Sequence, residues 1–185
     1  NKSFPTNAGS VGFDELVSKG ELVVNSAKDS GVGVPKLGLS KELVSESFLD
    51  SNNELMSQER GGFELSLECA LGDVSAWDGT SNSRFDFDFQ GFGERVANLC
   101  KDSVKPGKLE PGLFNVVFGF NAVNDLMSLL INGLRGDNVL KHNSFLEGKV
   151  GERVLSDSFN LSDVGALRNG SGNRVRDAEG VEVVD

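Results

Sequence analysis

The sequence is poor in the residues that build metal centres and catalytic triads. Its 185 residues include one histidine, two cysteines and no tyrosine. A zinc finger or ribbon needs closely spaced pairs of cysteine or histidine ligands, and Cys69 and Cys100 lack a CxxC spacing, so these sites are excluded. With His142 as the only imidazole, no Ser-His-Asp arrangement can be argued, and nothing in the sequence brings a cysteine to that histidine for Cys-His catalysis. We expect both cysteines to be reduced core thiols.

Long apolar runs and an excess of positive charge are missing as well. No run approaches the roughly 18 apolar residues that a membrane-spanning helix requires, and no secretory leader opens the chain. We therefore expect a cytoplasmic protein without membrane contact. The net charge of -10 argues against direct nucleic-acid binding, because an acidic surface repels phosphate groups. The chain begins at Asn1 rather than Met, which predicts an excerpt of a longer protein.

The spacing of apolar residues predicts an α+β fold. Phe13, Leu16 and Val17 follow the i, i+3, i+4 pattern of a helix, and the apolar stretch continues past Gly20. Strict alternation over 62–71 predicts a half-buried strand. The other elements expected are a return strand over 74–77 ending in a turn at 78–79, a strand over 85–89, a helix over 93–104, a buried strand over 113–120, a helix over 121–134, and short strands over 158–161 and 181–184.

Two Pro-Gly dipeptides, Pro106-Gly107 and Pro111-Gly112, mark the strongest boundary of the chain. They divide it into an N-terminal α/β portion with mainly antiparallel strands, 1–106, and the truncated start of a β-rich C-terminal domain, 107–185. The glycines of Gly31-Val32-Gly33 lack the third glycine of a dinucleotide fingerprint and predict a turn instead.

Several short motifs occur in an order that points to one family. They are Ser51-Asn52-Asn53, the alternating segment 62–70, Arg84 to Asp88, Pro111-Gly112 to Phe118, Leu134 to Asp137, Ser144 to Glu152, and Asp177 to Val181 preceded by a Gly-rich loop over 170–174. Together they resemble the TldD/PmbA family, proteins called modulators of DNA gyrase and also described as a two-subunit metalloprotease. The first 50 residues contribute nothing to this resemblance.

The resemblance implies which kind of subunit this is. TldD-type subunits carry an HExxxH motif on the central helix, in which histidines bind zinc and the glutamate acts as general base. Counted from Leu134, the histidine positions correspond to Met127 and Asn132 and the glutamate position to Ser128. None of these three side chains suits zinc-dependent hydrolysis. The chain thus resembles the PmbA (TldE) type, with no cofactor of its own and with zinc in a TldD-type partner.

The same resemblance implies a partner, a substrate and weak contact sites. The chain would pair with a TldD-type zinc subunit or form a homo-oligomer, and the complex would degrade unfolded peptides. Residues that could contact peptide or partner are Ser144, Lys149, Glu152, Asp177 and Glu179. An ion pair between Lys149 and Glu152, and glycine-dependent loop geometry, are the structural alternatives.

Two other functions remain open from the residues alone. Asp86, Asp88, Asp177 and Glu179 could serve a metal-dependent hydrolase that prefers a hard cation. For Asp86 and Asp88, a solvated strand face is the alternative. The chain could also be a standalone structural or binding module.

Overall fold

The computed structural model describes residues 2–3, 6–49, 51, 53, 55–165, 167, 169–177 and 181–183. The chain divides into two compact units. The first contains residues 1–108 and 163–185, and the second contains residues 109–162. The first break lies beside the Pro-Gly boundary of the sequence. Within the described residues, no helix is both long and apolar enough to cross a membrane.

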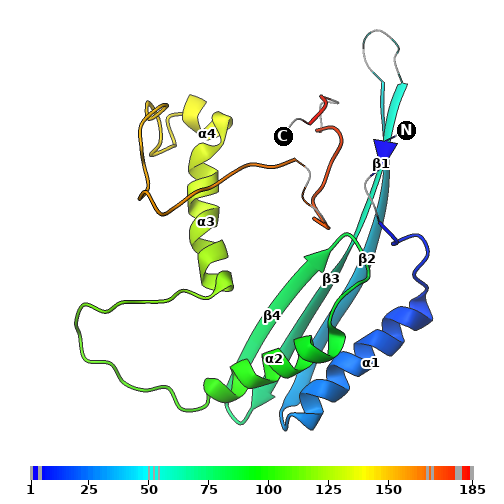
Figure 1. The fold of residues 1–185 in the computed structure, drawn as a ribbon, viewed down its shortest axis with the longest axis vertical. Coiled ribbons are helices and arrows are strands. Elements are labelled where there is room, and N and C mark those ends of the chain that lie inside the picture. The colour runs from blue at the N-terminus through cyan, green and yellow to red at the C-terminus, as the bar shows by residue number, and fades with distance from the viewer. Residues whose placement is uncertain are drawn as a thin grey trace. The chain divides into compact units, whose positions relative to one another are not determined.

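A four-stranded sheet forms the frame of the first unit (Figure 1). Its strands are β1 (Lys2–Ser3), β2 (Gly33–Leu49), β3 (Leu55–Leu71) and β4 (Val74–Asn82). β3 is central, because it pairs antiparallel with β2 on one side and with β4 antiparallel and β1 parallel on the other. β2 therefore lies at an edge of the sheet. The predicted alternation of β3 is confirmed, since Phe63, Leu65 and Leu67 are buried.

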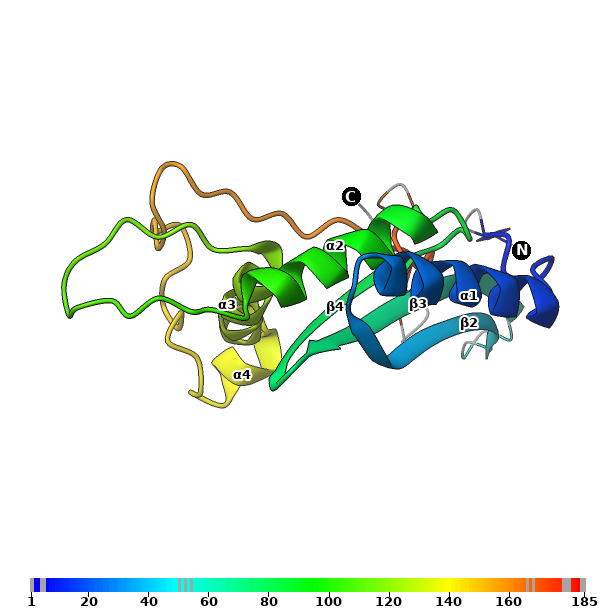
Figure 2. The same ribbon diagram turned by 90° about the horizontal axis from the view of Figure 1, so that it is seen from below.

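Helices α1 (Phe13–Asp29) and α2 (Phe89–Asp102) cover one face of this sheet (Figure 2). Their apolar sides and the inward residues of β3 form the main core. Its buried members are Val23, Ala27, Val32, Leu65, Leu67, Cys69, Phe89, Phe92, Val96, Ala97 and Cys100. The helices approach closely at Gly93, where an added methyl group would come within 2.5 Å of the Val23 carbonyl oxygen. Only glycine fits this crossing without a shift of α1. The α+β class expected from the sequence is confirmed.

The return of the chain from 163 onward is held on the first unit by one buried side chain. Gln58 of β3 is 5% exposed. Its carbonyl oxygen accepts hydrogen bonds from the backbone N–H groups of Val175 and Arg176, at 3.2 and 3.0 Å. Its amide nitrogen donates to the Arg176 carbonyl at 3.3 Å and to the Glu46 carboxylate at 2.7 Å. A strand residue and a segment more than a hundred positions later are thus fixed to each other.

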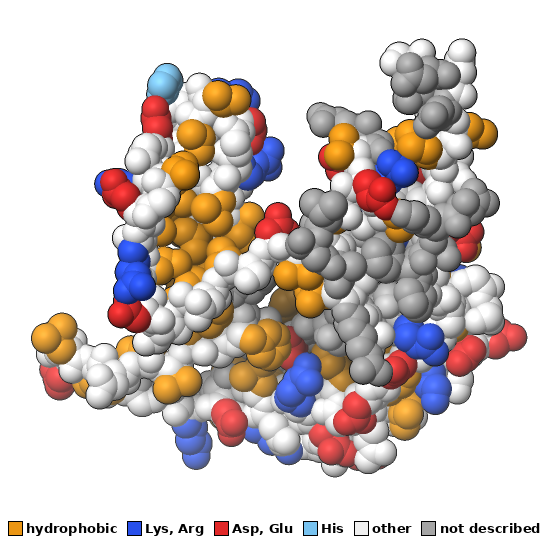
Figure 3. All heavy atoms as spheres, turned by 45° about the horizontal axis from the view of Figure 1, so that its top comes forward, with side chains coloured by type: hydrophobic (Ala, Val, Ile, Leu, Met, Phe, Trp, Pro, Cys, Tyr) orange, Lys and Arg blue, Asp and Glu red, His pale blue; other side chains and the backbone are white. Residues whose placement is uncertain are grey.

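The second unit contains α3 (Phe120–Leu134) and the short helix α4 (Gly136–Leu140), followed by turns. The described residues of this unit include two buried apolar or small positions on α3, Leu130 and Gly133, and one buried polar residue, Ser144. Many of its large apolar side chains face solvent, as the orange surface on the lobe that carries the histidine shows (Figure 3). The unit therefore has little core of its own.

The expected strand over 85–89 is wrong. Residues 83–88 form a connection without regular structure, and α2 begins at Phe89. The carboxylate of Asp88 caps that helix by accepting a hydrogen bond from the Gly91 N–H at 2.9 Å. The phenylalanines converge on the core instead of alternating along a strand, with the ring of Phe85 4.9 Å from that of Phe63. Helix capping and aromatic packing explain the pattern that suggested a strand.

The expected buried strand over 113–120 is also wrong. Residues 113–119 have no regular structure and no strand partner in the described part of the chain, and Phe120 already belongs to α3. The segment is exposed throughout, with Leu113 and Val117 close to full exposure. A β-prone run forms a strand only where another strand edge accepts its backbone hydrogen bonds. None of the described strands does so here.

Two smaller expectations are also corrected. β4 does not end at Asp78-Gly79 but continues to Asn82, because Asp78 is drawn inward to a partner on α2. Residues 158–161 form no strand. Of 181–184, Glu182 makes an isolated antiparallel bridge with Arg176, while residue 184 lies outside the described part.

Candidate functional site

The helix α3 carries Met127, Ser128 and Asn132, the three residues that the family resemblance aligns with a zinc motif. It begins after Gly119 and ends before Arg135. Met127 is half-buried, whereas Ser128 and Asn132 are exposed and one helical turn apart. The Ser128 hydroxyl donates to the Asp125 carbonyl at 2.7 Å, so it is used within its own helix. The helix is therefore present, and the side chains at these three positions are neutral and bind zinc weakly.

Ser144 fastens the following loop to the end of α3. Its hydroxyl donates to the Gly133 carbonyl and accepts a hydrogen bond from the Leu146 N–H at 3.0 Å. The neighbouring Phe145 ring lies against Gly133, where an added methyl group would come within 2.7 Å of a ring carbon. Ser144 and Gly133 thus shape the joint between helix and loop. The buried hydroxyl makes both of these contacts inside the unit.

Charged residues of this loop are exposed and paired locally. Lys149 Nζ lies 2.9 Å from Glu152 Oε2, and each of these two residues directly follows a glycine with positive φ, Gly148 or Gly151. His142 also has a positive φ, of 57°, and its Nδ1 lies 2.7 Å from Glu147 Oε1. The local ion pair that the sequence allowed is therefore present. Lys149 and Glu152 remain accessible to a further molecule, since each side chain is about half exposed.

Near the helix end, Asp137 is held as an anion. Arg135 donates from Nε to Asp137 Oδ1 at 3.0 Å, and Lys141 Nζ lies 3.9 Å from the other carboxylate oxygen. The hydrogen bond from Arg135, with these charges, lowers the pKa of Asp137 below its ordinary value, against an opposing effect of burial. These contacts hold Asp137 in place at the start of α4. None of them involves Met127, Ser128 or Asn132.

Asp177 lies in the first unit and shapes a turn. Its carboxylate accepts a hydrogen bond from the Val181 N–H at 2.9 Å, and its own N–H donates to the Val181 carbonyl at 2.9 Å. Glu179 lies outside the described residues. Among the described residues, no group of three histidine, cysteine, aspartate or glutamate side chains is close enough to hold a metal ion. Asp88, a carboxylate of the alternative hydrolase hypothesis, is the cap of α2.

The two cysteines are buried, free thiols, as the sequence predicts. Burial raises the pKa of Cys69 to about 11, with a smaller contribution from Cys100. The Cys100 thiol donates to the Cys69 carbonyl at 3.5 Å. A protonated, enclosed thiol is a poor nucleophile. Both cysteines belong to the first unit and His142 to the second.

Two polar residues escaped the sequence analysis. No sequence pattern indicated that Gln58 is buried, because a single glutamine in a strand is ordinarily exposed. Asp78 was taken for a turn residue, but its side chain is 4% exposed and accepts hydrogen bonds from Arg95 at 2.9 and 3.1 Å. On α2, Arg95 flanks the core face, with its guanidinium carbon 4.9 Å from the centroid of the Phe92 ring, and a single arginine at the border of an apolar face gave no hint of this partner. Both residues organise the first unit.

Comparisons with known proteins agree on one family. Residues 111–184 match the family model described as the PmbA/TldA metallopeptidase C-terminal domain. The metalloprotease PmbA homolog of Haemophilus influenzae is 27% identical over 171 residues, which cover 89% of this chain and 36% of that protein. The chain thus spans about a third of the length of the curated relatives it matches.

Solved structures share the fold. TldE from Thermococcus kodakarensis superposes with a TM-score of 0.80 at 23% identity, covering 100% of this chain and 44% of that one. A putative modulator of DNA gyrase from Thermotoga maritima gives a TM-score of 0.79 at 20% identity, with the same coverage of 100% and 44%. With the ordered motifs and the family-model match, these similarities lead to one conclusion: residues 111–184 match the C-terminal domain of the TldD/PmbA family, and the whole chain shares the fold of these solved structures.

Proposed function

We propose that this chain is a PmbA/TldE-like, non-zinc subunit of a TldD/PmbA-type metalloprotease complex. One observation carries the proposal. The helix α3 is formed, yet Met127, Ser128 and Asn132 occupy the positions of the zinc-binding histidines and the general base. A thioether and an amide are poor zinc ligands, and a hydroxyl cannot replace a carboxylate base. Zinc would be supplied by a TldD-type partner.

The surface of the second unit supports a role within an assembly. Leu129, Ile131 and Leu134 on α3 are each more than half exposed, as is Phe145 in the loop that follows. Exposed apolar side chains in this number are typical of a surface that another molecule covers. A two-subunit chamber that takes up unfolded peptides, in the cytoplasm, is the assembly we propose. The exposed pair Lys149 and Glu152 would contact peptide or partner at its rim, while Ser144 and Asp177 would hold the neighbouring loops in shape.

The test is reconstitution with a zinc-bearing TldD-type protein. We expect the two proteins to co-purify, zinc to follow the partner alone, and cleavage of an unfolded casein substrate to require both. Replacing Lys149 and Glu152 together by alanine should reduce cleavage by the mixture, whereas the matched change of Lys101 and Glu94 on α2 should leave it unchanged. Stoichiometric zinc on this chain alone, or cleavage by the partner that is indifferent to its presence, would refute the proposal.

A further inference from the structure

The edge strand β2 offers a long set of unused backbone hydrogen-bonding groups. It runs for 17 residues and pairs only with β3 among the described strands. Natural edge strands are usually protected by proline, bulges or short length. In β2 the backbone irregularity is confined to the start, where Pro35 lies between Gly33 and Lys36, and charged side chains are the protection found along the rest of the strand. From Lys36 to Leu49 the pairing register with β3 is regular, and none of the other described strands pairs with the outer edge of β2.

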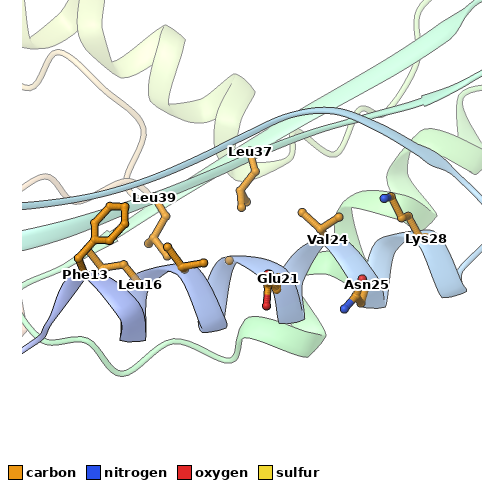
Figure 4. A pocket seen from close by; sticks show the side chains of 10 residues that line it. Phe13, Leu16, Glu21, Val24, Asn25, Lys28, Leu37 and Leu39 are labelled. Carbon is orange, nitrogen blue, oxygen red and sulfur yellow. The ribbon is translucent and has the colours of Figure 1, made fainter.

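A groove of about 520 Å³ adjoins this edge, lined by apolar side chains together with Glu21, Asn25 and Lys28 (Figure 4). Leu37 and Leu39 of β2 point into it, and the side of α1 forms its other wall. Phe13 and Val17 of α1 are 76% and 44% exposed there. α1 and β2 lie close together at Gly20, where an added methyl group would come within 3.0 Å of the Leu37 side chain. An open strand edge beside an apolar helix flank is the combination on which another strand and helix can pack together.

The order of charges along β2 favours one occupant. Lys36 and Lys41 lie in its first half, and Glu42 and Glu46 in its second half. Lys36 and Glu42 are both exposed, and neither has an ion-pair partner among the described residues. Both lie on the face of the sheet away from the helices, since Leu37 and Leu39 between them pair with the core residues Leu67 and Leu65. An antiparallel copy of the same strand therefore sets basic residues against acidic ones, whereas a parallel copy would oppose like charges.

The best match places a two-fold axis at Leu39. Lys36 of each copy then lies opposite Glu42 of the other, because both are three positions from the axis. On the helix side, the two Leu39 side chains meet between the apolar flanks of the two α1 helices. Lys41 does not obstruct this contact, since its Nζ is held by the Ala8 and Val11 carbonyl oxygens at 3.4 and 2.6 Å.

We propose that β2 and the adjoining flank of α1 form a self-complementary interface through which two copies of this chain join their sheets by antiparallel β2–β2 pairing. Such an interface is isologous and closes after two copies. It buries the groove lining and satisfies the edge backbone groups in a single contact. The inference stands independently of the proposed zinc-free role, because it rests on the first unit alone.

Charge reversal and rescue test this pairing in sedimentation experiments on the full chain. Lys36→Glu and Glu42→Lys should each weaken self-association about tenfold, because each change turns two symmetric attractions into repulsions. The double variant, with the charges exchanged, should restore association. Lys101→Glu on α2 makes the same charge change away from β2 and should have no effect. Circular dichroism of each variant confirms that the fold is retained.

Cross-linking tests the register. Leu39→Cys should form a disulfide between copies under mild oxidation, because residues opposite each other in antiparallel strands lie within disulfide distance, while Ser45→Cys should not. A chain that stays monomeric at all concentrations would overturn the proposal. So would association that survives Lys36→Glu but is lost in Val117→Asp, since it would arise from the second unit. Capture of a TldD-type partner on β2 without self-association would overturn it as well.

Discussion

Replacing Gln58 by alanine should release the returning segment of the chain from the sheet. The side chain is buried and makes its hydrogen bonds to Val175, Arg176 and Glu46. A net contribution of about 0.5–1.5 kcal/mol for each well-formed bond, with the 3.3 Å contact to Arg176 counted as weak, gives roughly 2–3 kcal/mol after solvation of the freed groups. The local opening of residues 175–176 should become about 30- to 150-fold more frequent.

Native-state hydrogen exchange measures this opening directly. The amides of Val175 and Arg176 should lose protection by that factor in Gln58→Ala, while amides of the central strand, such as that of Leu67, should change far less. Gln90→Ala is the matched control, because its exposed amide bonds only to Glu94. Unchanged protection of both amides in Gln58→Ala would show that the segment is held by other contacts, such as the Ser83 N–H to Asn169 carbonyl bond, and the reasoning would fail.

Three further predictions concern the first unit. Arg95→Ala should lower the free energy of unfolding by about 1–3 kcal/mol, because it removes the two charged hydrogen bonds that Arg95 donates to the buried Asp78 carboxylate, and an equal stability in urea titrations would contradict this. The pKa of Glu46 is lowered by its hydrogen bond to Gln58 and by Arg60. The ionised Glu46 carboxylate therefore contributes to the free energy of unfolding above its unfolded pKa near 4.5, and this contribution disappears as the pH falls through the folded pKa. Glu46→Gln should flatten the acid limb of a curve of stability against pH, and an unchanged limb would refute the assignment. Cys69 should resist thiol reagents at pH 8 until the chain unfolds, given a pKa of about 11 and full burial, whereas rapid labelling of the native protein would show that the core opens.

The sequence predicted the parts of the fold in which apolar residues follow the period of a regular element. The alternation of Phe63, Leu65 and Leu67 identified β3 because its two faces meet different environments. The helices α1 and α2 were found because each buries one face, and α3 was found from its apolar spacing although most of that face is exposed, with boundaries displaced by a few residues. Asp88 shows where this reasoning fails, because the same alternation of aspartate and phenylalanine can arise from a capped helix whose preceding aromatic rings converge on one core.

The candidate site was predictable only in part. Fixed spacing from Leu134 located Met127, Ser128 and Asn132 on α3, and the helix is present. The contact of Gln58 with Arg176 could not have been anticipated, because it joins residues 118 positions apart without a charge or motif to mark either. The run over 113–119 lacks a strand partner in the described residues, so its local β propensity did not produce a strand.

The exposed segment from Leu113 to Phe120 affects the tendency of the protein to aggregate. The window FNVVFGF, from 114 to 120, contains no charge and no proline, and its valine and phenylalanine side chains are exposed. Windows of this composition stack readily into intermolecular cross-β structure when nothing shields them. Glu110 and Pro111 before the window and Asp125 after it can act as gatekeepers that slow this process. Production and storage of the chain will therefore depend on how soon after synthesis the window is shielded.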